Sequence, residues 1–349
     1  MRVLARTVKG LEGLLADQLT QHRVGVIERF RPREVLFGTG HGLEAAWPGL
    51  RVADDAFVVA ACITGAGPRK SSLGRLASQL DPGRIRAVAS AVLASGGWGP
   101  GPGPVDVVAS IAGPHHYSRY DVEDRVGAAL GKILGRAYAS RRGIPGPRQA
   151  AMSWRVSIID GEAIVGLRWG ARPLHRRAYR QATVPGALHP PVAAAMAAIS
   201  GARHGVLLDP FCGSGTILIE SGLQAPLLHL VGLDLNPAAL AAAAGNARRA
   251  QIDVTLVRCD SARLPVAAGS ADVMLANPPW GIQVQAGGQL SELRDWMRLL
   301  DALRPGGTLV VADERPETAA RLSRCGLRLT RDLPISLHGR HPRIQQWHA

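Results

Sequence analysis

The second half of the chain alternates short apolar runs with longer segments in which apolar residues recur at helical spacing. The runs cover residues 206–208, 230–233, 254–257 and 273–276. Runs of this length and composition are typical of buried parallel strands. Residues 216–223 and the alanine-rich residues 238–249 have the pattern of helices. The alternation predicts an α/β fold with a doubly wound, mostly parallel sheet of the Rossmann-like type.

A polar side chain follows each of these apolar runs. The four residues are Asp209, Asp234, Asp260 and Asn277. Ligands of such sheets bind at the carboxyl ends of the strands, so we expect these side chains to line one crevice. Any single acid could instead cap the helix after it, but four at one edge favour a binding site.

The turn after the first run is rich in glycine, with the sequence Asp209-Pro210-Phe211-Cys212-Gly213-Ser214-Gly215. A strand, a glycine turn and a helix together place backbone N–H groups against a ligand. Asp234 lies about twenty residues farther on, where a carboxylate can accept hydrogen bonds from both ribose hydroxyls of a nucleoside-containing cofactor. The glycine turn alone is a weak signal, because dinucleotide-binding domains share it.

The fourth run ends in the tetrapeptide Asn277-Pro278-Pro279-Trp280. Asn277 offers a side-chain oxygen for the hydrogens of an amine, Pro278 fixes the backbone, and Trp280 offers a flat π-face. This combination indicates a nucleic-acid base amine as methyl acceptor. A plain turn closing the strand is the alternative for the tetrapeptide in isolation.

Together these motifs resemble those of class I S-adenosylmethionine methyltransferases that methylate amino groups. The glycine turn, continued by Thr216 and by Ile219-Glu220, is similar to that of the THUMP-domain RNA guanine-N2 methyltransferases. The Asn-first tetrapeptide resembles the TrmN-type tRNA enzymes and the large-subunit ribosomal RNA enzymes. An Asp-first version would resemble the archaeal and eukaryotic enzymes that act near the D-arm.

The resemblance implies S-adenosylmethionine as cofactor and the N2 amine of a guanosine as methyl acceptor. It implies that this guanosine lies in the acceptor stem of tRNA, with position 6 as the favoured nucleotide. The implied catalytic residues are Asn277, Pro278, Pro279 and Trp280. The implied cofactor-binding residues are Asp209, Phe211, Cys212, Gly213, Ser214, Gly215, Thr216, Asp234, Leu235, Asp260, Ser261 and Asn277.

Several other functions stay open at this point. A 23S ribosomal RNA guanine-N2 methyltransferase and a DNA or RNA adenine-N6 methyltransferase share the tetrapeptide. A nicotinamide-dependent oxidoreductase shares the glycine turn, although it has no use for the Asn-Pro-Pro-Trp corner. An inactive RNA-binding protein could keep the fold, but the intact Asn277 and Asp234 argue against it.

The first half of the chain has the pattern of a separate α+β region. We expect strands at residues 3–7, 34–37, 56–63 and 105–111, a hairpin of residues 154–159 and 162–168, and helices at 11–19, 43–50 and 121–141. The order resembles a ferredoxin-like domain followed by a THUMP domain. We therefore expect a ferredoxin-like domain at residues 1–55, a THUMP RNA-binding domain at 56–170, a basic linker at 171–189 and the methyltransferase domain at 190–349.

The formal net charge of +14 indicates a polyanionic partner, and RNA, in particular tRNA, fits best. Arginine supplies nearly all of the positive charge, and arginine makes bidentate contacts to phosphate and stacks on bases. Residues 173–180 form a basic segment that contains Tyr179, although an ordinary solvated linker has a similar composition. The expected RNA-binding residues are Arg172, His175, Arg176, Arg177, Arg180, Arg119, Arg69 and Lys70.

The four cysteines are scattered, with no spacing that suggests a zinc site or disulfides, so we expect no metal. The first residues lack the apolar core of a signal peptide, and no apolar run reaches membrane-spanning length. We therefore expect a cytoplasmic protein without membrane contact. A monomer is favoured.

Overall fold

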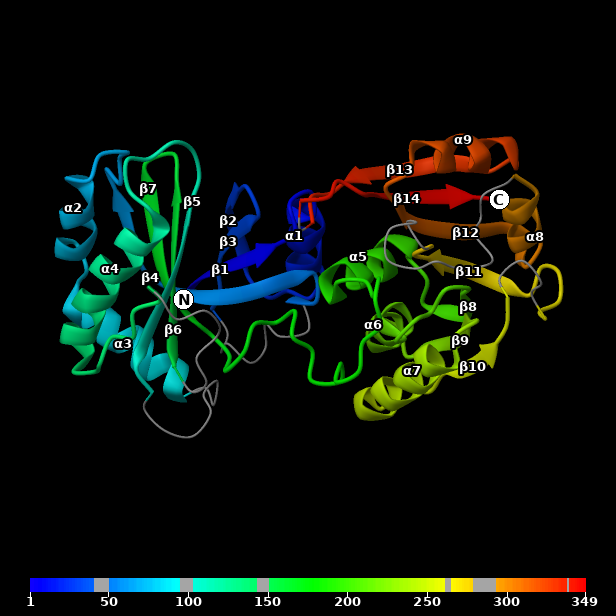
Figure 1. Cartoon of the computed structure of the whole chain (residues 1–349), viewed down its shortest axis with the longest axis horizontal. Helices are drawn as coiled ribbons and strands as arrows, with labels where there is room; N and C mark the ends of the chain where they lie inside the picture. The colour runs from blue at the N-terminus through cyan, green and yellow to red at the C-terminus, as the bar shows by residue number, and fades with distance from the viewer. Residues whose placement is uncertain (41–49, 95–102, 143–150, 261–264, 279–292, 338) are drawn as a thin grey trace. The chain divides into compact units, whose positions relative to one another are not determined.

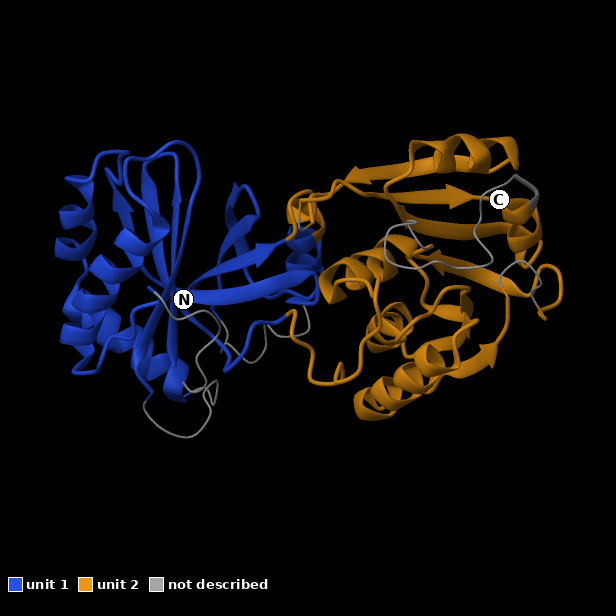
Figure 2. Ribbon diagram, in the orientation of Figure 1, with its two compact units in different colours: residues 1–7, 15–174 blue, residues 8–14, 175–349 orange. Residues whose placement is uncertain are grey.

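The computed structural model describes residues 1–40, 50–94, 103–142, 151–260, 265–278, 293–337 and 339–349 (Figure 1). The chain divides into two compact units (Figure 2). Unit 1 contains residues 1–7 and 15–174, and unit 2 contains residues 8–14 and 175–349. The boundary expected after residue 55 falls inside a strand, and residues 175–189, expected as a linker, group with unit 2.

Unit 1 is built on one seven-stranded sheet with the order β2-β3-β1-β4-β7-β6-β5. Its strands are β1 (Arg2–Thr7), β2 (Val26–Arg31), β3 (Glu34–Gly38), β4 (Ala53–Thr64), β5 (Val105–Ile111), β6 (Met152–Ile159) and β7 (Glu162–Arg168). Its helices are α2 (Ser72–Ser78), α3 (Pro82–Ala94) and α4 (Arg119–Leu134), while α1 (Glu12–Gln21) spans both units. All neighbouring strands are antiparallel except β5 and β6, which are parallel.

The strands predicted in this half and the hairpin at Asp160-Gly161 are present. The helix predicted at residues 121–141 instead begins at Arg119, where Ser118 and Asp121 form a capping box, and ends at Leu134. Gly135 adopts the left-handed conformation there and stops the helix. The helix predicted at 43–50 lies almost entirely outside the described residues.

Unit 2 is built on a second seven-stranded sheet with the order β10-β9-β8-β11-β12-β14-β13. Its strands are β8 (His204–Asp209), β9 (Leu227–Asp234), β10 (Thr255–Arg258), β11 (Ala271–Ala276), β12 (Leu303–Asp313), β13 (Arg328–Pro334) and β14 (Arg343–His348). Its helices are α5 (Pro190–Ser200), α6 (Thr216–Gln224), α7 (Pro237–Ala250), α8 (Leu293–Leu300) and α9 (Pro316–Arg324). The five strands from β10 to β12 are parallel, which confirms the predicted doubly wound, mostly parallel sheet.

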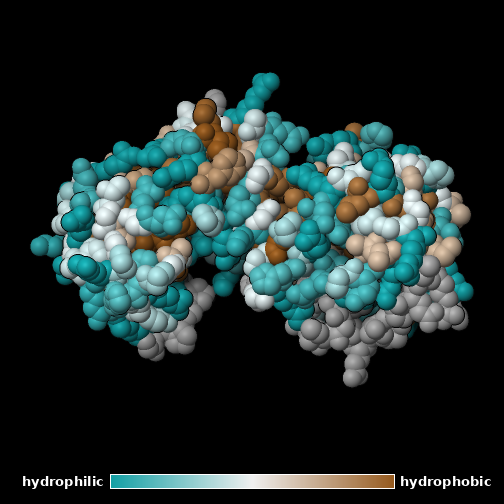
Figure 3. Space-filling model, turned by 90° about the horizontal axis from the view of Figure 1, so that it is seen from above, coloured by the Kyte–Doolittle hydropathy of each residue, from teal (hydrophilic) through white to brown (hydrophobic). Residues whose placement is uncertain are grey.

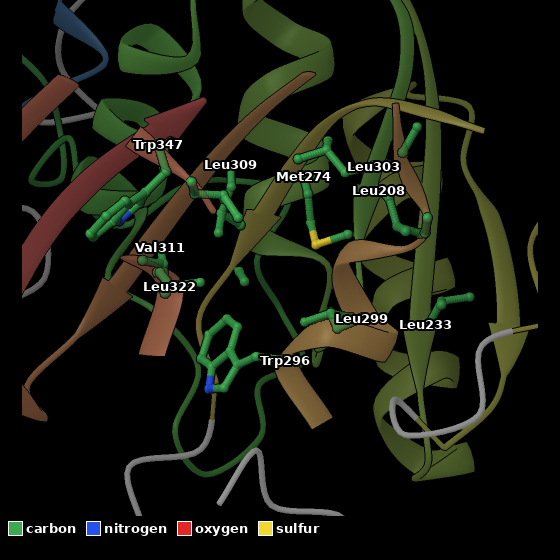
Figure 4. Packing of buried hydrophobic residues seen from close by; sticks show 14 residues of the cluster. Leu208, Leu233, Met274, Trp296, Leu299, Leu303, Leu309, Val311, Leu322 and Trp347 are labelled. Carbon is green, nitrogen blue, oxygen red and sulfur yellow. The ribbon is translucent and has the colours of Figure 1, made fainter. Parts of the chain in front are cut away.

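The core of unit 2 fixes the sheet against its helices. Trp296 and Leu299 of α8 and Leu322 of α9 pack on Met274 and Leu309 of the strands (Figure 4). A separate cluster of Tyr179, Ile219 and Ala247 lies where α6 and α7 meet the segment before α5. Full burial of side chains of this size contributes roughly 1.5–3 kcal/mol each, so the sheet is a rigid support for groups at its edge.

No helix in the described part of the chain is long and apolar enough to cross a membrane.

Candidate active site

The strand order of unit 2 reverses between β8 and β11, and ligands of doubly wound sheets bind at such a point. Because β8, β9 and β11 are parallel, their carboxyl ends lie at the same edge of the sheet. Asp209 ends β8, Asp234 ends β9, and Asn277 follows β11 directly. The structure therefore brings together the polar residues that the sequence places at the strand ends.

The glycine turn joins β8 to α6 and is held by backbone hydrogen bonds. The Cys212 N–H donates to the Leu233 carbonyl (2.9 Å), and the Gly215 N–H donates to the Cys212 carbonyl (2.8 Å). Gly215 has a φ of +78°, and a Cβ there would lie 3.1 Å from the Ala243 side chain, so only glycine fits without strain. Among the described residues, no side chain caps the start of α6. A helix start of this kind offers N–H groups to a ligand.

Asp209 is fully buried, and its burial raises the pKa of the carboxyl to about 8, helped by the negative charge of Asp234. The Phe211 N–H donates to Asp209 Oδ1 (3.1 Å), which lowers the pKa in part. Asp209 Oδ2 has no hydrogen-bond partner among the described residues. A buried polar atom without a partner is costly, and a polar ligand group at this edge would remove that cost.

Asp234 connects the glycine turn to the start of α7. Its Oδ2 accepts a hydrogen bond from the Gly213 N–H (2.9 Å), and its Oδ1 accepts one from the Asn236 N–H (2.8 Å). Each carboxylate oxygen can accept a further bond, so both remain able to bind ribose hydroxyls. The next residue, Leu235, is 49% exposed and offers an apolar surface beside the carboxylate. Asp260 lies half-buried two residues after β10.

Asn277 carries an oriented amide. Its Nδ2 donates to the Gly186 carbonyl (3.3 Å), while its buried Oδ1 has no hydrogen-bond partner in the described part of the chain. A side-chain oxygen held in this way can accept a hydrogen from an amine. Pro278 is buried beside it, whereas Pro279, Trp280 and Ser261 lie outside the described residues.

The basic segment before α5 has both buried and exposed members. Arg177 Nε lies 2.8 Å from Oε1 of the fully buried Glu220, and the Tyr179 hydroxyl donates to the same oxygen (2.8 Å). Only 10% of the Arg177 side chain is exposed. Arg176 is exposed, and His175 and Arg180 are half-buried. The geometry thus gives Arg177 a structural contact, while Arg176 is exposed to solvent.

Unit 1 presents an open pocket of about 460 Å³ at the end of β5, lined in part by His115, Tyr117 and Arg119. The Arg119 guanidinium lies over the Tyr120 ring, 4.7 Å from its centroid. The other basic residues expected here to bind RNA, Arg69, Lys70 and Arg172, are exposed. Much of the protein face seen in Figure 3 is hydrophilic, with hydrophobic residues in small groups.

The contacts of three residues of unit 2 were not predicted from the sequence, although Glu220 was named there as part of the glycine-turn motif. They are Glu220, Asn246 and Gly186. The polar Asn246 on the alanine-rich face of α7 was a signal, because a buried amide there needs partners. The positions of Glu220 and Gly186 gave no comparable signal. Within the described residues, no group of His, Cys, Asp and Glu is placed to hold a metal ion.

The geometry fits a cofactor with a nucleoside and a polar tail. The start of α6 after the glycine turn has no side-chain cap among the described residues, Asp234 has acceptor capacity for hydroxyls, and Asp209 Oδ2 lacks a partner there. S-adenosylmethionine has these groups. Asn277 Oδ1 is a further acceptor at the same edge, where the amine that receives a methyl group would bind.

Comparison with known proteins identifies relatives of the chain. Residues 177–331 match the family model described as the RMKL-like methyltransferase domain. The tRNA (guanine(6)-N2)-methyltransferase of Thermus thermophilus is 33% identical over 249 residues, which span 70% of this chain and 72% of that protein. The U6 snRNA (guanine-N(2))-methyltransferase THUMPD2 of Bos taurus is 28% identical over 186 residues, 52% of this chain and 36% of that protein. The crystal structure of TrmN from Thermus thermophilus superposes with a TM-score of 0.74 at 27% identity and covers 99% of both chains.

Proposed function

This chain belongs to the TrmN-type family of S-adenosylmethionine-dependent RNA guanine-N2 methyltransferases, and we propose that its substrate is tRNA, methylated at guanosine 6 of the acceptor stem. The relative named for this position spans most of the chain at 33% identity. The observation that carries the proposal is Asn277 Oδ1, a buried acceptor at the carboxyl edge of β11 without a partner in the described residues. A dehydrogenase has no need for such an acceptor.

The acceptor oxygen addresses the main difficulty of the reaction. The lone pair of a guanine N2 amine is delocalised into the ring, so the amine is a poor nucleophile. Hydrogen bonds from the two amine hydrogens to Asn277 Oδ1 and to the Pro278 carbonyl would favour a pyramidal nitrogen with its lone pair directed at the methyl group. The site therefore contributes positioning, which can lower a barrier by several kcal/mol.

Bound S-adenosylmethionine supplies an electrophilic methyl group on a positively charged sulfur. Transfer to the amine would form the N–C bond as the C–S bond breaks and would pass the positive charge from sulfur to nitrogen. The proton on that nitrogen would then be acidic enough to leave to water, so a strong base would not be required. Asp234 would hold the ribose, and the glycine turn would hold the methionine part of the cofactor.

The target guanosine must leave its helix to reach the edge of the sheet, which costs roughly a few kcal/mol. Stacking on Trp280 would offset part of that cost. The exposed Arg69, Lys70 and Arg119 of unit 1 would bind phosphates and supply affinity for RNA. We expect the enzyme to act as a monomer in the cytoplasm, with residues 56–170 as its THUMP RNA-binding domain.

The test is mass spectrometry of nucleosides from purified tRNA and rRNA of a strain that lacks the protein. We expect N2-methylguanosine at position 6 of tRNA to disappear, and to return with the wild-type gene but not with Asn277→Ala. Unchanged tRNA would overturn the proposal. Loss of the nucleoside from 23S rRNA instead would favour the ribosomal alternative.

A further inference from the structure

A strap of residues 177–187 runs from the ion pair at Glu220 to the amide of Asn277 within unit 2. Its last part is a turn in which the Ala187 N–H donates to the Val184 carbonyl (3.1 Å). Pro185 fixes one backbone angle of this turn, and Gly186 adopts a φ of +77°. The turn therefore has one preferred geometry, which sets the direction of the Gly186 carbonyl.

The middle of the strap is anchored by Asn246 of α7, whose side chain is completely buried. Asn246 Oδ1 accepts hydrogen bonds from the N–H groups of Gln181 and Ala182, both at 3.2 Å. Asn246 Nδ2 donates to the carbonyls of Ala182 (2.8 Å) and Ser214 (3.0 Å). One amide thus ties the strap to the glycine turn, and both of its donor hydrogens are used.

The start of the strap is anchored by Glu220 of α6. This acid is fully buried and receives Arg177 Nε and the Tyr179 hydroxyl on the same oxygen. Removing either side of a buried ion pair is strongly unfavourable, so this contact is rigid. The two anchors come from the two helices that follow the glycine turn and Asp234.

Gly186, near the end of the strap, determines which side-chain atom Asn277 presents to the substrate amine. A carbonyl can only accept, so the Gly186 carbonyl selects the orientation in which Asn277 Nδ2 faces it. The opposite orientation would set two oxygens against each other and would present NH2 in place of the acceptor. Guanine N2 hydrogens need an acceptor, so that orientation would be unproductive.

We propose that Asn246 and Glu220 are positioning residues that hold the strap, and that its Gly186 carbonyl orients the Asn277 amide for catalysis. The inference deepens the proposed function and rests on it for the identity of the amine. It also explains why an amide suits position 277 in this chain. A carboxylate there would place a charged oxygen against the Gly186 carbonyl.

The experiment compares Asn246→Ala with Gln224→Ala in the full chain. Gln224 is a matched control, because its Nε2 also donates to two backbone carbonyls, of Ala194 and Glu220, at 3.1 Å each, and neither carbonyl belongs to the strap. Asn246→Ala should lower kcat on a tRNA transcript by about tenfold or more with little change in the tRNA KM. Gln224→Ala should leave kcat near wild type at matched melting temperatures.

Repeating Asn246→Ala in the Asn277→Asp variant separates an effect on the orientation of the Asn277 amide from a general effect on folding. A carboxylate presents an oxygen whichever way it turns, so Asn246→Ala should not lower kcat further in Asn277→Asp. A role limited to folding would lower kcat equally in both backgrounds. Equal losses would overturn the proposal.

A direct readout does not depend on RNA or activity. The 15N NMR signals of the Asn277 side-chain amide, assigned by their loss in Asn277→Ala, should shift or broaden in Asn246→Ala and stay unchanged in Gln224→Ala. Gly186→Ala, which keeps Asn246, should change them in the same way. Unchanged signals in both variants would refute the strap, whereas a wild-type protein that methylates no tRNA would refute only the proposed function.

Discussion

Each of the two units contains its own seven-stranded sheet, but the strand directions differ between the two sheets. This difference determines which unit holds the candidate active site. Five neighbouring strands of unit 2 are parallel, so their carboxyl ends collect Asp209, Asp234 and Asn277 at one edge. The sheet of unit 1 is antiparallel apart from one pair, so its strand ends alternate. A mostly antiparallel sheet cannot assemble a comparable row of side chains.

Buried charge differs between the units as well. In unit 1, Arg168 lies 2.8 Å from Asp55, and Arg31 lies 3.5 Å from Glu34. In unit 2, Asp209 accepts one backbone hydrogen bond and keeps Oδ2 without a partner in the described residues. The buried acids Asp55 and Glu34 of unit 1 are thus paired with arginine, as Glu220 is in unit 2, whereas Asp209 keeps an acceptor oxygen for a ligand.

The largest effect is expected at the acceptor oxygen. Asn277→Ala should lower methyl transfer to background, by about a thousandfold or more, because the amine loses its hydrogen-bond acceptor. S-adenosylmethionine affinity should be nearly unchanged. Tritium transfer to tRNA and titration calorimetry check both parts, and full activity in the variant would remove Asn277 from catalysis.

Two neighbouring arginines test the division between buried and exposed charge. Arg177→Ala should lower the free energy of unfolding by about 3–5 kcal/mol, because Glu220 would be buried without its cation. Arg176→Ala, at an exposed position, should change stability by less than about 0.5 kcal/mol. Denaturant unfolding measures both, and equal stabilities would contradict the structural role of Arg177.

Substitution of Asp234 tests whether its carboxylate binds the cofactor at the carboxyl ends of the parallel strands. Asp234→Ala should weaken S-adenosylmethionine binding by about 1.5–3 kcal/mol, the usual range for hydrogen bonds to a charged group. Asp234→Asn keeps one acceptor oxygen and should have a smaller effect. Calorimetry with the purified full chain decides, and undiminished affinity in Asp234→Ala would mean that another residue holds the ribose.

The raised pKa of Asp209 predicts that the stability of the protein depends on pH. Its folded pKa of about 8 lies above the ordinary value of 3.8, so the folded state binds more protons between these values. Its contribution to stability is therefore fully present below about pH 4 and is lost as the pH rises through 8. Asp209→Asn should melt higher than wild type at pH 8.5 and much like it at pH 4. The exposed Asp253→Asn is the control, and parallel pH profiles for wild type and Asp209→Asn would contradict the assignment.

The smallest effects are expected on the surface of unit 1. Arg119→Ala should weaken tRNA binding by about tenfold or less and reduce the slope of log affinity against log salt by about one. S-adenosylmethionine affinity should stay unchanged. Arg324→Ala, at an exposed position of α9, is the control. Filter binding at several salt concentrations provides the measurement, and an unchanged slope for Arg119→Ala would place the RNA elsewhere.

Local signals made four strands of unit 2 predictable, β8 to β11, because each apolar run and the polar residue after it lie together in the sequence, whereas β12, β13 and β14 were not predicted. The edge strand β2 was missed, since its charged and exposed residues have no strand-like apolar face. The end of α4 was misplaced although Gly135 marks it. The burial of Arg177 could not be seen, because its partner Glu220 lies 43 residues away.

The most direct test of the account uses purified protein, S-adenosylmethionine and two tRNA transcripts. One has guanosine at position 6, and the other has inosine there, which lacks only the N2 amine. Mass spectrometry of digested products should find N2-methylguanosine in the first transcript and no methylation in the second. Equal methylation of both transcripts would contradict the assignment of the guanosine N2 amine as the acceptor.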